Sequence, residues 1–325
     1  MNKPQKIRWL IAHEPINLFL RTANAFKSKI AELTDNQIEV EIFTPSEYAK
    51  SYQRVENENN NKIVDPMVSM EAGLLEMSQL HITELAIWHS PDFFALELPF
   101  IFRDHEHAAT VLEGPIGQKM LGDLKDRSPA QGLAFTYSGG FRCIVADNEV
   151  VTLADLKDQV YAIASNPVSH DMVESIGAVP KSFKIKDFFR HAGRTEGFNA
   201  NVLETTIPRY LALYKDQTNK RYMINTKHSL FLTSIIVSNK FWASLDQDTQ
   251  NKFNEACLYA SRLERQWSVE DAENFSNKKD HSDIGVTYHE LSKNDTAEFK
   301  KLTQPVVDKY KDFFTAGLVD GIIRS

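Results

Sequence analysis

Apolar and polar residues follow one another along the chain in patterns that predict strands and helices in turn. Residues 6–12 (KIRWLIA) form a short apolar run typical of a buried strand. A helix is expected next, because one of its faces carries Leu18, Thr22, Phe26, Ile30 and Leu33. Residues 38–43 then alternate apolar with polar side chains, as a half-buried strand does. A short β-α-β unit implies a parallel sheet, so the expected fold class is α/β.

The same alternation of elements resumes in the second half of the chain. Further helices are expected at residues 68–77, 104–124, 153–157, 170–176 and 186–191. Further strands are expected at residues 80–82, 132–137, 141–146, 160–164 and 235–238. Ser138-Gly139-Gly140 separates two of these strands, which suits a chain that passes in extended form from one domain to another.

One continuous helix is predicted from Phe241 to about residue 277. Asp246 can cap it, and its apolar stripe carries Phe253, Ala256, Cys257, Ala260, Leu263 and Trp267. At about 1.5 Å per residue such a helix would be roughly 55 Å long, which exceeds the width of a small domain. We therefore expect it to span two domains.

Length and composition agree with two domains and exclude some partners. A chain of 325 residues exceeds the usual limit of a single hydrophobic core. Its net charge of -7 argues against a nucleic-acid partner, which needs a basic surface. No apolar stretch reaches the roughly 20 residues that cross a bilayer. Residues 1–15 do not resemble a secretory signal, so the protein is either cytosolic or has lost a leader. We expect Cys143 and Cys257 to be unpaired thiols.

Several strings resemble solute-binding proteins of TRAP transporters, of the dicarboxylate-binding (DctP) type. Residues 98–104 (LPFIFRD), with His107-Ala108 and residues 114–117 (GPIG), are similar to that family's LPFLFRD…GPIG stretch. Residues 236–242 (IVSNKFW) resemble its strand leading into the long helix. Further matches run in order from about Ile7 to Phe314. Their order and spacing together make the resemblance specific.

The resemblance implies a periplasmic-binding-protein-like clamp with crossing connections. Domain I would comprise residues 1–139 and 229–268, and domain II residues 140–228 and 269–325, with a ligand cleft between them. Such a protein captures a small solute, commonly an organic anion, in the periplasm and hands it to membrane permease subunits. It needs no cofactor, metal or catalytic residue. A periplasmic ligand sensor of the same fold is the alternative function.

The resemblance also points to residues that would contact the solute. Arg142 matches an arginine that contributes to binding the ligand's acid group, and a guanidinium suits a carboxylate; the alternative is a strand-end arginine in a surface ion pair. The family's main carboxylate-binding arginine corresponds to Ala162, which leaves the ligand class open. Arg142 alone, or another cation such as Lys184, Arg190 or Arg194, would have to hold the acid.

The remaining candidates come from other stretches of the same resemblance. Glu204 matches a retained glutamate, and Thr205 replaces an asparagine that usually bonds the ligand. The other candidate ligand contacts are His13, Trp88, Phe93, Phe94, Tyr137 and His228. Core packing or a structural hydrogen bond is the alternative role for each of these.

An enzyme is the competing class of function, and the sequence argues against it. The chain has no G-x-S-x-G, H-E-x-x-H, Walker A or G-x-G-x-x-G motif. His105 and His107 resemble a metal-binding pair, but no third ligand stands at a fixed spacing. Glu14 and Glu204 could imitate an acid-base pair, yet nothing fixes their separation.

Overall fold

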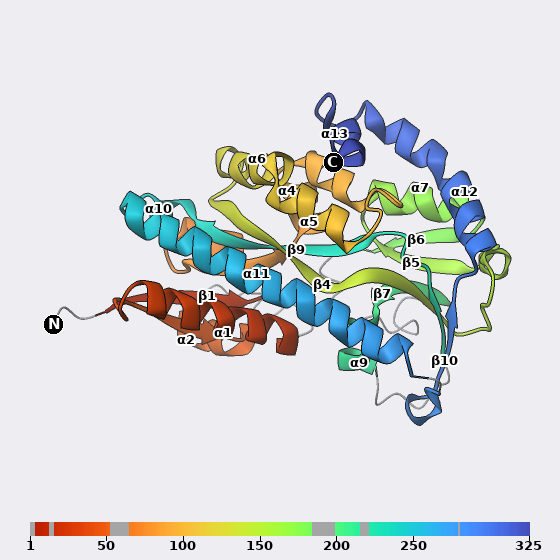
Figure 1. The fold of residues 1–325 in the computed structure, drawn as a ribbon, viewed down its shortest axis with the longest axis horizontal. Coiled ribbons are helices and arrows are strands. Elements are labelled where there is room, and N and C mark those ends of the chain that lie inside the picture. Colours follow the sequence, from red (N-terminus) through yellow and green to blue (C-terminus); the bar gives the residue numbers. More distant parts are fainter. Residues whose placement is uncertain (1–3, 13–15, 53–64, 184–198, 215–220, 279) are drawn as a thin grey trace. The chain divides into compact units, whose positions relative to one another are not determined.

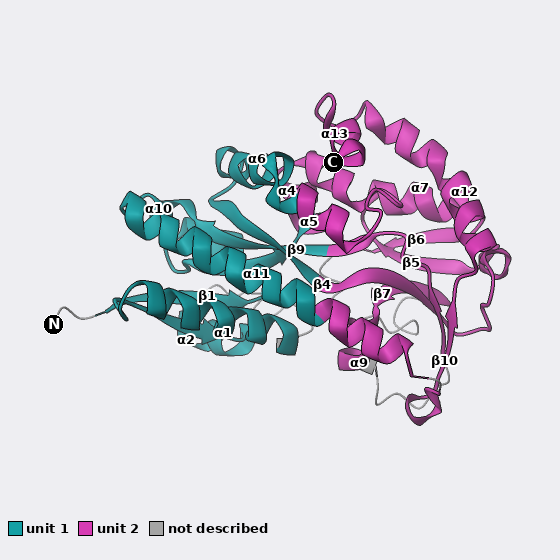
Figure 2. Ribbon diagram, viewed as in Figure 1, with its two compact units in different colours: residues 1–82, 112–137, 232–267 teal, residues 83–111, 138–231, 268–325 magenta. Residues whose placement is uncertain are grey.

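The computed structural model describes residues 4–12, 16–52, 65–183, 199–214, 221–278 and 280–325. The chain divides into two compact units, each assembled from three separate segments (Figure 2). Unit 1 comprises residues 1–82, 112–137 and 232–267, and unit 2 comprises residues 83–111, 138–231 and 268–325. The sequence-based division placed residues 83–111 in the first domain. Here they belong to unit 2, where Phe100 packs edge-on against Phe299.

Unit 1 is built on a mixed sheet (Figure 1). Strand β1 (Gln5–Ile11) pairs in parallel with β2 (Ile38–Phe43) and with β3 (Met77–His81). Strand β3 pairs antiparallel with β9 (Leu230–Ser238). The residues described in this unit also form α2 (Pro45–Tyr52), α3 (Pro66–Glu71), α6 (Pro115–Asp123) and α10 (Asn239–Trp242).

The core of unit 1 forms where α1 (Ile16–Leu33) and α11 (Gln247–Ser276) meet the sheet. The apolar stripes expected from the sequence supply this contact. The ring of Phe26 packs between two other aromatic rings. Its centroid lies 5.1 Å from that of Trp9 on β1 and 5.6 Å from that of Phe253 on α11. All three side chains are completely buried. Full burial of such aromatic groups stabilises a core by about 1.5–3 kcal/mol each.

Unit 2 contains the second sheet. Strand β4 (Ala130–Ala146) pairs antiparallel with β7 (Val202–Thr206) and β8 (Arg221–Asn225). Strand β5 (Val160–Ala164) pairs in parallel with β7 and with β6 (Val179–Phe183), and β8 pairs in parallel with β10 (Val286–Glu290). The mixed α/β class expected from the sequence is therefore confirmed.

Helices cover both faces of the unit 2 sheet and create two cores. On one face, α7 (Pro167–Ser175) and α12 (Lys293–Lys311) cover what we call the α7 face. On the other, α9 (Ile207–Tyr214) and the last turns of α11 cover the α9 face. The described part of the unit also contains α4 (Ile82–Trp88), α5 (His105–Glu113) and α13 (Leu318–Arg324).

Two of the expected helices are divided in the structure because of local backbone chemistry. The expected helix at 104–124 is two helices, since Gly114 and Pro115 end α5 and start α6. The expected helix from Phe241 is the short α10 followed by α11, which begins at Gln247. Asp246 accepts the backbone N–H of Thr249 at 2.8 Å, so it caps α11 as predicted. The expected helix at 186–191 lies outside the described residues.

Strand β4 is continuous where two strands were expected. Gly139 and Gly140 do not end it; they adopt φ values of 93° and 87° within the strand. Cys143, further along β4, and Cys257 of α11 are both buried and free. Among the described residues, the helices are too short or too polar to cross a membrane.

Gly139 is the position in β4 where a side chain fits least. A Cβ there would lie 2.2 Å from the Thr206 hydroxyl oxygen. Gly73 also has a positive φ but would place its Cβ in open space. We therefore expect Gly73→Ala to cost about 1 kcal/mol of unfolding free energy, from backbone strain alone. Gly139→Ala should cost at least about 1–3 kcal/mol more, because a neighbour must move. Urea unfolding of both variants measures the difference, and equal losses would contradict the contact.

Candidate functional site

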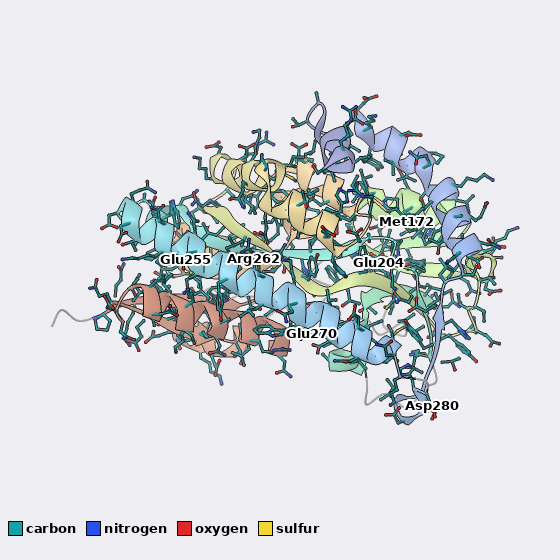
Figure 3. The ribbon with its side chains drawn as sticks, in the orientation of Figure 1. Met172, Glu204, Glu255, Arg262, Glu270 and Asp280 are labelled. Atoms are coloured by element: carbon teal, nitrogen blue, oxygen red, sulfur yellow. The ribbon has the colours of Figure 1, made fainter. Side chains whose placement is uncertain are left out.

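Arg142 is buried in the sheet of unit 2 and is only 6% exposed. In the register of β4 with β7, Arg142 stands opposite Thr206, and Ile144 stands opposite Glu204. Directly opposed residues share a face of the sheet, and side chains alternate along each strand. Arg142 and Glu204 therefore both project from the α7 face. Figure 3 shows Glu204 on this sheet.

The Arg142 guanidinium binds two carboxylates. Its Nη1 donates to Glu204 Oε1 at 3.0 Å, and its Nη2 donates to Glu97 Oε1 at 3.1 Å. Glu97 ends a short 3₁₀ helix at residues 91–97. Its carboxylate also accepts from Thr83 Oγ1 at 2.7 Å and from Asn166 Nδ2 at 2.8 Å. One buried cation thus holds β4, β7 and the segment around Glu97 together.

His228 completes this cluster from the segment between β8 and β9. Its Nε2 lies 3.1 Å from Glu204 Oε2, and its Nδ1 lies 2.7 Å from the Thr226 hydroxyl. Its ring stacks on Phe299 with 5.5 Å between centroids. A carboxylate only accepts, so Nε2 of His228 carries the hydrogen whether the ring is neutral or charged. In the neutral ring Nδ1 therefore has no hydrogen and accepts from the Thr226 hydroxyl. We call Glu97, Arg142, Glu204 and His228 the Arg142 cluster.

The pKa values of the two carboxyls in the Arg142 cluster are shifted in opposite directions. Burial raises the pKa of Glu97, and the attraction of Arg142 and the Thr83 hydrogen bond do not cancel that increase. Burial also acts to raise the pKa of Glu204. There the charge of Arg142 and the hydrogen bond from His228 are stronger, so its pKa lies below the ordinary value. On acidification Glu97 therefore takes up a proton before Glu204 does.

A second buried arginine lies close to this cluster. The ring of Phe231, on β9, lies next to both arginines. The distance from the ring centroid to the guanidinium carbon is 4.0 Å for Arg142 and 5.5 Å for Arg209. Arg209 belongs to α9 and is 3% exposed. Both guanidinium groups thus lie within cation–π distance of one aromatic ring. Sequence reasoning did not single out Arg209, Phe231, Glu97 or Asn166. The one available signal was charged and amide side chains within otherwise apolar stretches.

Two of the sequence-predicted residues lie on the opposite face of the sheet. Thr205 stands opposite Cys143, so it projects from the α9 face. Ala162 of β5 pairs with Leu203 of β7. It belongs to the core on the α9 face and has no exposed surface. The structure thus brings Arg142, Glu204 and His228 into contact, while Ala162 and Thr205 point away from them. The Thr205 hydroxyl is buried and has no hydrogen-bond partner among the described residues.

The other sequence candidates are spread over both units. Trp88 ends α4 and is 66% exposed, whereas Phe93 and Phe94 are buried in unit 2. Tyr137 is buried at the end of the unit 1 part of β4. His13 lies outside the described residues, as do Glu14, Lys184, Arg190 and Arg194.

His107, one of the two histidines considered for a metal, has another role. His107 Nδ1 accepts the backbone N–H of Arg103 at 3.1 Å, and Nε2 lies 2.8 Å from the carbonyl of Ile322. Both ring nitrogens are therefore engaged in unit 2.

A different group on α7, formed by His170, Asp171 and Glu174, has ligand atoms within 4.8 Å of one another. Asp171 already pairs with Lys309 at 2.5 Å, and that ammonium opposes a second cation there.

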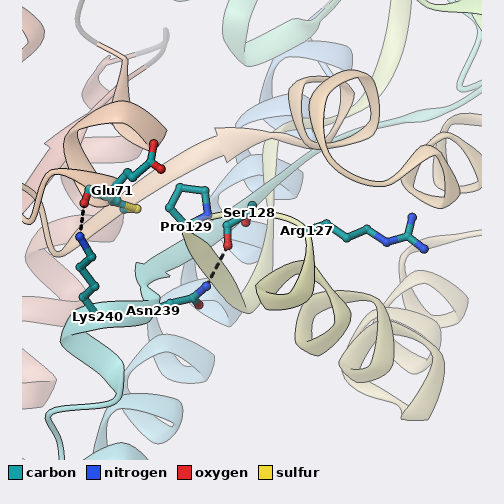
Figure 4. A pocket seen from close by; sticks show the side chains of 7 residues that line it. Glu71, Arg127, Ser128, Pro129, Asn239 and Lys240 are labelled. Atoms are coloured by element: carbon teal, nitrogen blue, oxygen red, sulfur yellow. Dashed lines mark hydrogen bonds between the residues drawn. The ribbon is translucent and has the colours of Figure 1, made fainter.

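Unit 1 has a surface hollow of roughly 450 Å³ near the start of β4 and the end of β9 (Figure 4). Its polar groups bind its own walls. Asn239 Nδ2 donates to the Ser128 carbonyl at 2.8 Å, and Lys240 Nζ donates to the carbonyl of Glu71. Arg127 points away from these groups (Figure 4). The lining of this hollow contains none of the sequence-predicted site residues. The Arg142 cluster is therefore the candidate functional site.

Comparison of the sequence with known proteins identifies its family. A family model described as bacterial extracellular solute-binding protein, family 7, matches residues 12–312. The C4-dicarboxylate-binding protein DctB of Bacillus subtilis is 24% identical over 309 residues, which cover 93% of this chain and 81% of that protein. The C4-dicarboxylate-binding periplasmic protein DctP of Rhodobacter capsulatus is 22% identical over 294 residues, covering 88% of this chain and 80% of that protein.

Solved structures show the same fold. A TRAP periplasmic solute-binding protein of Polaromonas sp. JS666, bound to D-erythronate, matches with a TM-score of 0.80 at 21% identity and covers 98% of both chains. The sugar-acid-binding protein of Advenella mimigardefordensis, in complex with galactonate, matches with a TM-score of 0.78 at 20% identity. That match covers 100% of this chain and 98% of the other.

Removing the cation of the Arg142 cluster should leave two buried carboxyls, Glu97 and Glu204, without their ion-pair partner. Arg142→Met keeps most of the aliphatic stem, and we expect it to lower the unfolding free energy by roughly 3–5 kcal/mol. The loss should be larger at pH 8 than at pH 5, because at pH 5 the carboxyls can be buried as neutral acids. Thermal and urea unfolding at both pH values measure this.

Arg221→Met is the matched control. Arg221 is also buried, but its partner Asp147, at 2.5 Å, keeps 33% of its side chain exposed. Its loss should therefore be smaller and less dependent on pH. Equal losses for the two variants at both pH values would contradict the central position of Arg142.

Proposed function

Because this chain belongs to the bacterial extracellular solute-binding proteins of family 7, we propose that it is the periplasmic solute-binding component of a TRAP transporter. In this role it captures a small organic acid, delivers the acid to membrane permease subunits and does no chemistry on it. The observation that carries the proposal is the family match over residues 12–312. The names of the similar solved proteins, bound to D-erythronate and galactonate, support an acidic solute. Two domains that close over the solute remain a prediction from the sequence.

Charge is the main question for an acid, because the expected arginine position holds Ala162. Arg142 alone is a weak source of positive charge, since Glu97 and Glu204 both bind it. Arg209 adds a second guanidinium beside the same Phe231 ring. We propose that Arg209 supplies the positive charge that Ala162 lacks, and that Arg142 holds the site's shape. A planar guanidinium suits a carboxylate because it offers parallel N–H donors.

The chemical class of the solute can be tested with small molecules that differ in charge. We expect members of a panel of succinate, D-erythronate, D-galactonate and D-glucuronate to raise the melting temperature. A matched panel of neutral sugars and amines should not. At a concentration of 100 times Kd, a ligand adds about 2.7 kcal/mol to the unfolding free energy. A thermal-shift screen measures this, and stabilisation by amines alone would exclude an organic acid.

The part played by Arg209 can be separated from that of Arg142. For the acid that binds best in the screen, Arg209→Met should weaken affinity by about tenfold or more, since lost charge-assisted contacts cost roughly 2–5 kcal/mol. Titration calorimetry measures affinity. The control is Arg262→Met on α11 (Figure 3), an arginine that pairs with Glu113 and whose side chain is 60% exposed. An unchanged affinity for Arg209→Met would remove Arg209 from the site.

Delivery to a permease needs its own test. The genes beside this one should include the small and large membrane subunits of a TRAP permease. Uptake of the bound acid by proteoliposomes that contain those subunits should require this protein. A neighbouring histidine-kinase gene, with no uptake, would instead indicate a ligand sensor.

A further inference from the structure

Glu264 lies on α11 and is completely buried in unit 1. Gln79 Nε2 of β3 donates to its two carboxyl oxygens at 2.8 and 3.1 Å. The Thr22 hydroxyl of α1 bonds to Oε2. The Thr136 hydroxyl and the backbone N–H of Tyr137, both on β4, also contact the carboxyl. All these partners are neutral, in contrast to the charged partners of the Arg142 cluster.

The number of hydrogens in this network indicates the charge state of Glu264. The Thr22 hydroxyl has one hydrogen, yet its oxygen lies 3.0 Å from the Leu18 carbonyl and also contacts Glu264 Oε2. A carbonyl can only accept. If Thr22 donates to Leu18, the second bond needs a hydrogen on Glu264. A protonated carboxyl therefore satisfies both bonds at once.

The amide of Gln79 is equally short of hydrogens. Besides the carboxyl of Glu264, its Nε2 contacts Thr136 Oγ1 at 2.7 Å and Thr233 Oγ1 at 3.1 Å. Two amide hydrogens cannot serve four oxygens. A proton on Glu264 removes one acceptor from this competition. Burial also raises the pKa of Glu264 to about 8, although its hydrogen-bond donors oppose the shift.

Charged groups on the surrounding elements are engaged elsewhere. Near the network, Glu76 immediately precedes β3 and pairs with Arg8, and His81 at the end of β3 lies against Phe19. On α1, Arg21 lies over the ring of Trp267.

On α11 itself, Arg262 and Arg265 both pair with Glu113. Tyr137 of β4 contributes its backbone N–H, and β9 has no charged side chain within four residues of Thr233.

The network stands where the chain leaves and enters unit 1. Thr136 precedes the boundary at 137/138, and Thr233 follows the boundary at 231/232. Glu264 precedes the boundary at 267/268, and Gln79 precedes the one at 82/83. Each lies within four residues of its boundary. Through Glu264 and Gln79 the network thus involves four of the five segments that connect unit 1 with the rest of the chain.

We propose that Glu264 is an internal proton-binding site, whose neutral carboxyl holds β3, β4, β9 and α11 in register and whose ionised form loosens these connecting segments. This role is separate from the solute binding proposed for Arg209 and Arg142. Its consequence for stability has a definite sign. In the unfolded chain Glu264 is an ordinary carboxyl that ionises near pH 4.3. The folded protein keeps the proton to about pH 8, so stability falls as pH rises through this interval.

Glu264→Gln tests the proposal because it mimics the neutral carboxyl. We expect the wild-type melting temperature to fall between pH 5 and pH 8 more steeply than that of the variant. Infrared spectroscopy should show a protonated-carboxyl carbonyl band in the wild type that titrates near pH 8 and is absent in Glu264→Gln. Amides of β4 and β9 should exchange faster at pH 9 only in the wild type, after correction for intrinsic rates.

Two controls identify the group. Glu255→Gln replaces an exposed carboxyl on the same helix (Figure 3) and should leave all three readouts unchanged. Glu97 is another buried carboxyl, so the spectra are repeated in Glu97→Gln, where the Glu264 band should persist. If Glu264→Gln does not fold, the band is followed in Thr22→Val, which removes the hydroxyl on Glu264 Oε2, and a titration midpoint equal to that of the wild type would overturn the assignment. A wild type without a titrating band, or a band that remains in Glu264→Gln, would overturn the proposal.

Discussion

The fold of unit 2 depends on one buried cation held between two carboxylates. Arg142 joins the middle of β4 to Glu204 on β7 and to Glu97, which is far away in sequence. A buried guanidinium is tolerated only when its hydrogen bonds are satisfied, so each of the three groups fixes the position of the others. His228, Asn166 and Thr83 satisfy the remaining oxygens. The geometry of the candidate site is therefore also part of the architecture.

Both units bury carboxyl groups, but the groups that surround those carboxyls differ. In unit 2, charge balances charge around Arg142. In unit 1, Glu264 is surrounded by hydroxyl, amide and backbone donors, and burial raises its pKa although these donors oppose the increase. Replacing a buried charge pair alters the balance between two ionised groups, whereas replacing Glu264 alters the uptake of a proton. The two clusters should thus respond to pH independently.

Much of the fold was predictable because period and capping are local. The strand at 38–43, the stripe of α1 and the Asp246 cap were read from spacing alone. The break between α5 and α6 and the continuity of β4 were missed, since glycine allows both a stop and a strained passage. The site was harder. Arg142, Glu204 and His228 were found by resemblance, but Arg209 and Glu97 meet them only through long-range pairing. Strand register, which no single-sequence pattern fixes, turned Ala162 and Thr205 to the other face.

The interleaved order of the segments also bears on how the chain acquires its structure during synthesis. The core of unit 1 needs Phe253, Ala256 and Ala260, and that of unit 2 needs Phe299. Neither core can be completed until most of the polypeptide has left the ribosome. Nascent chains will therefore expose apolar β segments for nearly the whole period of translation, a state that favours aggregation. A protein built in this way needs a holding chaperone more than one whose domains are consecutive in sequence.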